Sequence, residues 1–342
     1  MIIGSLALVT SIASRFHDRF KAAGQVPVPD TVQYLGMTIT RDHKKRSFTI
    51  DQIGYINRVL DRFEMTDSQQ RSTPMETGYK PHAIRVEDGE KPYLDISNYQ
   101  KAIGSVLYAA LGTRPDITYA ITVLGRYAAK PSVFHWVAVK HLLRYLRGTS
   151  NYKLTIYDPD RSPESSILCY ADADLGGEID TCKSTSGIVV YALGILVIWK
   201  SKKQTLVAQS TMQAEMIATA YSKVQVDWLQ DVISEIGLSI GIAKQILNDG
   251  LNCVTTLNSG NFQPESWHIR LRFHSIHEAV AKRDLEIRHI PGTEMRADAL
   301  TKSLGGVKLG EFVEEIRLRW AWMEIEFGLW NGRIWYGMDD LV

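Results

Sequence analysis

The stretch LCYADAD, residues 168–174, decides the fold. It is an apolar run that ends in two carboxylates, as a buried strand does when its carboxyl end reaches the polar edge of a sheet. Apolar segments at 188–191 and 195–200 predict a hairpin, and Ser210 with Gln213 forms a capping box that predicts a long helix. A strand, a helix, a strand and a short helix follow, so this half is predicted to be a mixed sheet with helices on its faces.

Four acidic residues lie at the ends of these predicted elements. Asp172 is on the first strand, Glu215 is in the first turns of the long helix, Asp249 ends the fourth strand and Asp298 begins the last helix. Ligands gather at the carboxyl ends of strands, and carboxylates that converge there without a cationic partner usually bind a divalent cation. Oxygen ligands favour Mg²⁺ or Mn²⁺, and two such ions can drive phosphodiester hydrolysis. The alternative is that each acid is a cap or is solvated, since the chain holds 38 acidic residues.

The first half of the chain has a different pattern. Residues 32–40 and 46–50 are predicted as two strands, and a short helix follows to residue 63. Residues 68–92 are polar and contain Pro and Gly, which is typical of a linker or long loop. Residues 97–148 predict three helices, so this half is mainly helical.

Composition limits the classes of protein that fit. The chain has 342 residues, 45% of them apolar and 23% charged, which is ordinary for a globular protein of about two domains. A net charge of +1 gives no global attraction to nucleic acid or membrane, so any basic surface is local. The three cysteines form no metal or disulfide pattern, and no apolar run reaches the length of a membrane span. We therefore expect an intracellular protein without a membrane partner, in the cytoplasm or alternatively the nucleus.

Ordered motifs give the chain a specific resemblance. The second half contains YADAD at 170–174, KSTSG at 183–187, SKKQ at 201–204 and ADALTK at 297–302. The first half contains IGSVLY at 103–108, TRPDI at 113–117 and LRYLRGT at 143–149. In this order they closely resemble the Pol polyproteins of copia-type retrotransposons, over residues 1 to about 310. The matching regions are the reverse transcriptase downstream of its polymerase site and the ribonuclease H domain.

This resemblance implies a fold and an activity. The fold is α/β: a ribonuclease H-like mixed five-stranded sheet with flanking helices, preceded by a truncated α+β and helical reverse transcriptase remnant. The implied domains are a palm-end and thumb remnant with linker (1–92), a helical connection region (93–160), a ribonuclease H-like domain (161–306) and an unmatched Trp-rich tail (307–342). The activity is two-metal hydrolysis of RNA in RNA–DNA hybrids, with two Mg²⁺ or Mn²⁺ ions. The family's metal-binding acids fall on Asp172, Glu215, Asp249 and Asp298, with Asp174 as a neighbour.

The same context favours nucleic-acid contacts by two groups of basic residues. Lys140, Arg144 and Arg147 share one face of a predicted helix and can follow phosphates, although a solvated face is an equal alternative. Lys202, Lys203 and Gln204 form a compact basic loop that is expected to contact the hybrid backbone. Hybrid recognition would rest on shape, phosphates and the 2′-hydroxyl. The partners implied are an RNA–DNA hybrid and the rest of a Pol protein.

Departures from the family pattern keep a second interpretation open. The Tyr-x-Asp-Asp turn of the polymerase is expected before residue 1 and is absent, so the chain as given is not expected to polymerise. Gly-Leu-Asn at 250–252 stands where the family usually has Asn-Gln-Ser, and Arg270 replaces an acidic residue. The alternative is an inactive retrotransposon remnant that at most binds nucleic acid, which leaves the assignment as an enzyme open.

Overall fold

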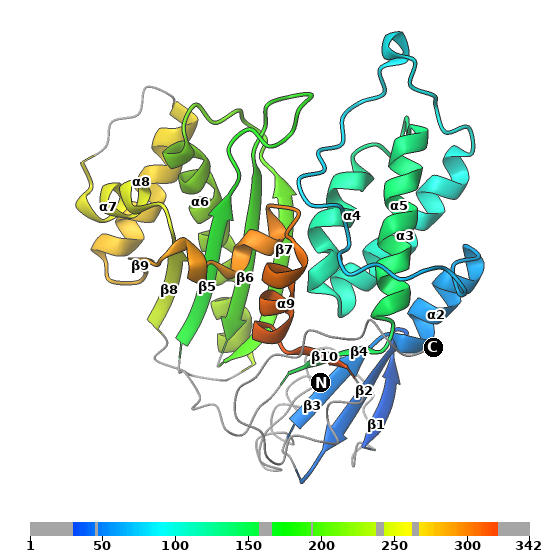
Figure 1. Cartoon of the computed structure of the whole chain (residues 1–342). Coiled ribbons are helices and arrows are strands. Elements are labelled where there is room, and N and C mark those ends of the chain that lie inside the picture. The colour runs from blue at the N-terminus through cyan, green and yellow to red at the C-terminus, as the bar shows by residue number, and fades with distance from the viewer. Residues whose placement is uncertain are drawn as a thin grey trace.

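The protein contains two five-stranded sheets (Figure 1). The structure is a computed structural model, and it describes residues 30–44, 47–156, 166–192, 194–236, 243–261 and 267–320. The first sheet has the order β1-β2-β3-β4-β10, and each neighbouring pair is antiparallel. Its strands are β1 (Thr31–Tyr34), β2 (Met37–Asp42), β3 (Ser47–Asp51), β4 (Tyr152–Thr155) and β10 (Leu318–Trp320). The predicted domain ends at 1–29 and 321–342 lie outside the described residues.

The second sheet is mixed and has the order β7-β6-β5-β8-β9. β6 is antiparallel to both of its neighbours, β5 and β7, whereas β8 runs parallel to β5 and β9 parallel to β8. The strands are β5 (Ser166–Ala173), β6 (Thr185–Ala192), β7 (Ile195–Lys203), β8 (Ala243–Asn248) and β9 (Glu286–His289). This confirms the predicted mixed five-stranded sheet with flanking helices.

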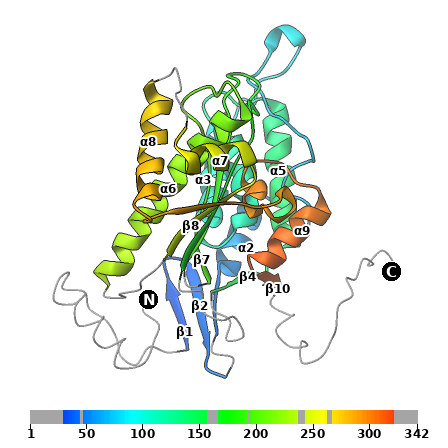
Figure 2. The same ribbon diagram turned by 90° about the vertical axis from the view of Figure 1, so that its left-hand side faces the viewer.

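Side chains of β5 alternate between two cores, as the period of a strand requires. Ile167, Cys169 and Ala171 join a buried cluster with the helices on one face, whereas Tyr170 joins the cluster on the other face. The helices of the first face are α6 (Thr211–Glu235), α7 (Leu251–Ser259) and α8 (Trp267–Ala281), which Figure 2 shows from the side. Because both faces are covered, every residue of β6 is buried.

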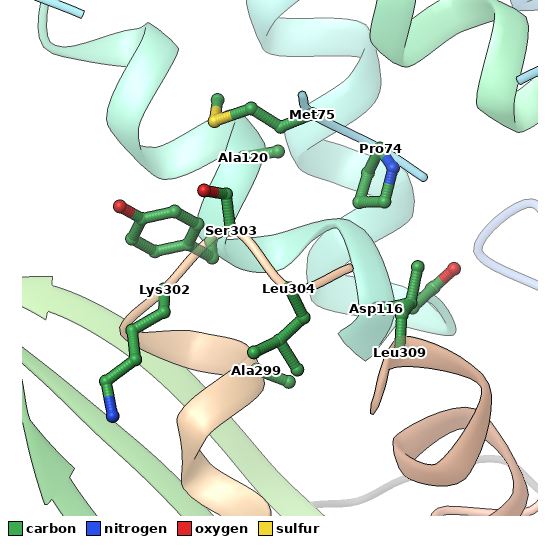
Figure 3. Close-up of a pocket in the computed structure, with 10 residues that line it drawn as sticks. Pro74, Met75, Asp116, Ala120, Ala299, Lys302, Ser303, Leu304 and Leu309 are labelled. Atoms are coloured by element: carbon green, nitrogen blue, oxygen red, sulfur yellow. The ribbon is translucent and has the colours of Figure 1, made fainter. Parts of the chain in front are cut away.

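The opposite face packs against the helical first half of the chain. Tyr99, Val189 and Leu300 belong to one buried cluster although they come from distant segments, and Trp199 Nε1 donates a hydrogen bond of 2.7 Å to the Ala110 carbonyl oxygen. The elements on this side are α2 (Ile53–Arg62), α3 (Ile96–Gly112), α4 (Thr118–Gly125), α5 (Val133–Gly148), the 3-10 turn η4 (Arg296–Leu300) and α9 (Gly306–Glu315). Figure 3 shows the seam, where Met75 and Ala120 of the first half line one pocket with Ser303 and Leu304. None of the helices in the described part of the chain has both the length and the apolar character needed to cross a membrane.

A fully buried ion pair anchors the helical half. Arg114 has no exposed surface, and its Nε and Nη2 donate to the two carboxylate oxygens of Asp116 at 2.9 and 2.6 Å. The guanidinium also donates to the backbone carbonyl and hydroxyl oxygens of Thr149, and the Tyr145 hydroxyl donates to Asp116 at 2.8 Å. These bonds satisfy both charges, as burial of an ion pair requires. The TRPD motif therefore has a structural function in this fold.

One predicted strand was wrong in its extent, and two features of the fold were not predicted. Residues 32–40 do not form one strand, because Leu35 and Gly36 adopt positive φ angles of 47° and 70° and turn the chain between β1 and β2. The short helix α7, on which the buried Cys253 lies, was not predicted. The segment after residue 306, which was predicted as an unmatched tail, contains α9, which packs into the shared core, and β10, which completes the first sheet.

Candidate metal centre

Three carboxylates meet at one edge of the second sheet. Asp172 lies near the end of β5, Asp249 follows β8 directly, and Glu215 lies in the first turns of α6. Because β5 and β8 are parallel neighbours, their carboxyl ends reach the same edge. One carboxylate oxygen from each of the three residues lies within 4.8 Å of those of the other two. The arrangement offers a cluster of hard oxygen ligands of the type that Mg²⁺ and Mn²⁺ prefer.

Burial makes this cluster hard to ionise without a cation. Asp172 is 2% exposed and Glu215 is 7% exposed. Burial, with the nearby Asp172 carboxylate, raises the pKa of Glu215 to about 9. Burial also raises the pKa of Asp172 to about 7, although the Lys302 ammonium opposes this increase. A divalent cation would supply the charge that keeps both groups ionised, so the residues present fit such an ion.

Asn248 fixes the position of Glu215. The fully buried Asn248 side chain donates through Nδ2 to Glu215 Oε2 at 2.8 Å and to the Ala171 carbonyl oxygen at 3.0 Å, and its Oδ1 accepts from the Gly250 amide at 2.8 Å. The Ala173 amide lies 3.4 Å from Glu215 Oε1. The sequence analysis missed this residue, because an Asn at the end of a strand more often belongs to a turn.

Asp298 lies beside the three carboxylates but outside the group. Its Oδ1 accepts a hydrogen bond of 2.7 Å from Lys302 Nζ, which also lies 3.7 Å from Asp172 Oδ2. The Thr301 hydroxyl donates to the same Asp172 oxygen. The premise that the carboxylates have no cationic partner was therefore wrong, since Lys302 is paired with two of the four predicted acids.

Glycine at position 187 brings η4 close to the sheet. Gly187 is the register partner of Asp172, and a Cβ added to it would lie 2.7 Å from the Ala297 carbonyl oxygen. No side chain fits at that distance without a shift of the backbone. The absence of a side chain here lets η4, which carries Asp298, lie directly against β6.

Two further residues border the cluster. Asp174 is directed away from it, because its carboxylate accepts from the Thr185 amide and its own amide donates to the Thr185 carbonyl oxygen at 3.2 Å. His289 Nε2 lies 3.1 Å from the Asp249 carbonyl oxygen. The sequence analysis did not identify His289, which precedes the loop at 291–296 where no histidine occurs.

The predicted basic loop was wrong, because Lys202 and Lys203 end strand β7 and Gln204 follows it directly. Lys202 is exposed, and its ammonium lies 4.6 Å from the centre of the Tyr221 ring. Lys203 is paired with the buried Glu178 at 2.8 Å. Gln204 is 4% exposed and donates to the Ser186 hydroxyl and the Ala214 carbonyl oxygen, both at 2.9 Å. The side-chain amide of Gln204 therefore forms its hydrogen bonds inside the fold and is not exposed at the surface.

The three basic residues of α5 lie apart from this end of β7. Lys140, Arg144 and Arg147 are all partly buried, and Arg147 Nε donates to the Thr66 carbonyl oxygen of the preceding loop. His141 on the same helix lies 2.9 Å from the Thr73 carbonyl oxygen. The loop at 66–73 thus covers part of this face. In Figure 1, α4 lies between α5 and the second sheet.

Several curated proteins are similar to the chain in sequence. No protein-family model matches the chain. It is similar to the retrovirus-related Pol polyprotein from transposon TNT 1-94 of Nicotiana tabacum, with 36% identity over 276 residues, 79% of this chain and 20% of that protein. It is also similar to the Pol polyprotein from transposon RE2 of Arabidopsis thaliana, with 30% identity over 84% of this chain and 19% of that protein. The chain thus spans about a fifth of the length of these curated relatives.

Solved structures show a weaker likeness. The chain is similar to LC11-RNase H1 in complex with an RNA/DNA hybrid, with 18% identity and a TM-score of 0.30 over 40% of this chain and 94% of that one. The foamy viral protease-reverse transcriptase in complex with an RNA/DNA hybrid gives 10% identity and a TM-score of 0.41 over 85% of this chain and 34% of that one.

Proposed function

The chain belongs to the Pol polyproteins of copia-type retrotransposons, and from that premise we propose that its second half is a ribonuclease H. It would hydrolyse the RNA strand of RNA–DNA hybrids. The observation that supports this activity is the meeting of Asp172, Glu215 and Asp249 within 4.8 Å at the edge of the second sheet. Asp172 and Glu215 are buried and Asp249 is half-buried, so carboxylates this close together need a cation to stay ionised, and divalent cations are the catalysts of phosphodiester hydrolysis in such sites.

The chain's own residues would bind and orient the ions. Asp172, Glu215 and Asp249 would hold one Mg²⁺ or Mn²⁺, and Asp298 would join them for a second. When bound, the two ions would supply an activated water and stabilise the departing 3′-oxygen. Asn248 keeps the Glu215 carboxylate aimed at the cluster through its 2.8 Å hydrogen bond. Supporting bonds of this type commonly set metal affinity.

We also propose that Lys202 contacts the phosphates of the hybrid. It is exposed on the edge strand β7, and its ammonium is held over the Tyr221 ring. The remaining basic residues are weaker candidates. Lys203 is neutralised by Glu178, and Arg147 is bonded to the covering loop. A phosphate contact by Lys202 would make binding salt-dependent without base specificity.

Cleavage of a hybrid with a labelled RNA strand tests the proposal. Wild type, Asp172→Asn and Asp61→Asn are compared with Mg²⁺ and with Mn²⁺, after thermal unfolding has shown that all three are folded. Asp61 is an exposed residue of α2 and serves as a matched control. We expect RNA cleavage by wild type and by the control, and its loss in Asp172→Asn. No cleavage by folded wild type in either metal would refute the enzyme and favour the inactive remnant.

A further inference from the structure

Lys302 places a positive charge at the position where the proposed function needs a metal ion. Its ammonium lies 2.7 Å from Asp298 Oδ1 and 3.7 Å from Asp172 Oδ2. The two carboxylates come from distant elements, η4 and β5, and the ammonium bridges them. A single charge of +1 neutralises only part of the charge that the three clustered carboxyl groups and Asp298 can carry. The structure therefore shows the cluster with a partial counter-ion of its own.

Local geometry directs this ammonium toward the cluster. The Lys302 amide donates to the Asp298 carbonyl oxygen at 3.0 Å, which folds the turn so that residues 298 and 302 lie on the same side. Thr301, between them, donates its hydroxyl to Asp172 and lies 3.2 Å from the Asp298 carbonyl oxygen. Figure 3 shows the Lys302 side chain extending away from Met75 and Ala120, on the side of the sheet strands.

The same side chain is free to leave. It is 46% exposed, whereas the Asp172 side chain is 2% exposed, so the ammonium can move into water without disturbing the core. A lysine of this exposure regains the hydration of its ammonium when it leaves the two carboxylates. A divalent cation bound to Asp172 or Asp298 would share its ligand oxygens with the ammonium. Two cations at such short range repel one another, so binding of one opposes the other.

We propose that Lys302 is an internal counter-ion that occupies the metal-free centre and is displaced when the divalent cation binds. It holds Asp298 and Asp172 together before the metal arrives, and it weakens metal binding by the free energy of its own pairing. This inference rests on the proposed function, because it concerns the affinity of the same metal centre. It makes Lys302 a positioning residue that sets the metal concentration at which the centre fills.

Direct measurement of Mn²⁺ binding tests this role. The free Mn²⁺ remaining in solution is followed by electron paramagnetic resonance during titration of the full chain, without any substrate. Lys302→Met and Lys302→Gln remove the charge, Lys302→Arg retains it, and Lys282→Met is the matched control. Lys282, which follows the last residue of α8, pairs with Glu278 four residues earlier at 2.6 Å and is 69% exposed, so it forms an ion pair with the same spacing.

The outcomes separate this inference from the proposed function. We expect Lys302→Met and Lys302→Gln to bind Mn²⁺ at least about fivefold more tightly than wild type, because a competing charge has gone. Lys302→Arg and Lys282→Met should stay within about twofold of wild type. Unchanged or weaker binding by both charge-removing variants would overturn the inference while the proposed function stands. If folded wild type shows no saturable Mn²⁺ binding, the proposed function fails and the inference fails with it.

Discussion

Binding of a divalent cation should expel protons from the metal centre at neutral pH. Burial raises the pKa of Glu215 to about 9 and that of Asp172 to about 7 in the metal-free protein. At pH 7, Glu215 is then almost fully protonated and Asp172 is half protonated. Metal ligands must be ionised, so binding of one ion should release about 1.5 protons per chain. Unperturbed carboxyl groups would release almost none at this pH.

The dependence on pH follows from the sign of the two pKa shifts. Both pKa values are raised, so the metal-free centre holds more protons than the metal-bound centre below pH 9. The release should approach about 2 protons at pH 5 and fall to about 0.2 at pH 9.5. It therefore decreases as the pH rises through the two pKa values.

Isothermal titration calorimetry measures this release. Mn²⁺ is titrated into the protein in phosphate and in Tris, whose ionisation enthalpies differ, and the change in apparent enthalpy gives the number of protons. Glu215→Gln removes the largest contributor and should lower the release to about 0.5 proton at pH 7, whereas Asp61→Asn should leave it unchanged. A wild-type release below about 0.5 proton at pH 7, or one that increases with pH, would refute the reasoning.

Three more substitutions probe the packing around and beneath the centre. Arg114→Met leaves the buried Asp116 carboxylate without its counter-charge and should lower the free energy of unfolding, measured in urea, by about 3–5 kcal/mol. A loss under about 1 kcal/mol would contradict a fully buried pair. Gly187→Ala places a methyl group 2.7 Å from a carbonyl oxygen of η4 and should cost about 1–3 kcal/mol in thermal unfolding. Gly104→Ala, whose methyl group meets nothing within 4 Å, should not destabilise, so similar losses in both variants would argue against the close approach. Asp174→Asn can keep its backbone hydrogen bond and should retain hybrid cleavage within about threefold, while Asp172→Asn loses at least about a hundredfold. Equal losses would place Asp174 in the centre.

Local patterns were sufficient for the main elements of the second sheet. The apolar run before Asp172 and the capping residue Ser210 both predicted their elements, and the structure has β5 and α6 there. The Ser210 hydroxyl accepts from the Gln213 amide at 3.2 Å, as the sequence pattern predicted. Such elements depend on hydrophobic periodicity and on caps, which are visible in one sequence. The mixed sheet could therefore be predicted from their order.

The errors have physical causes that a single sequence hides. Leu35 carries a side chain in the left-handed region, which L-residues seldom occupy, so it gave no turn signal. The helix α7 has nine residues and follows β8 almost directly, so its short apolar pattern resembled a continuing strand. The left-handed Gly260 that ends it was the available signal.

The contacts of Lys302 could not be predicted for a different reason. Its spacing of four residues from Asp298 is visible in the sequence, but such pairs usually lie on solvated helix surfaces. Its second partner, Asp172, is 130 residues earlier in the chain and meets it only because η4 packs on β6 at Gly187. Long-range contacts of this kind could not be read from spacing.

The pairing of β10 with β4 has a consequence for the order in which the chain folds during synthesis. Leu318 is the register partner of Leu154, so residues 156–317 are inserted between two adjacent strands of the first sheet. On the ribosome, β4 is synthesised before these residues and β10 after them. The first sheet therefore lacks its last strand for on the order of 10–30 s. The whole second sheet is synthesised within that interval. Throughout this interval β4 is an edge strand whose backbone groups on the β10 side have no partner. An edge strand of this kind can pair with a neighbouring chain.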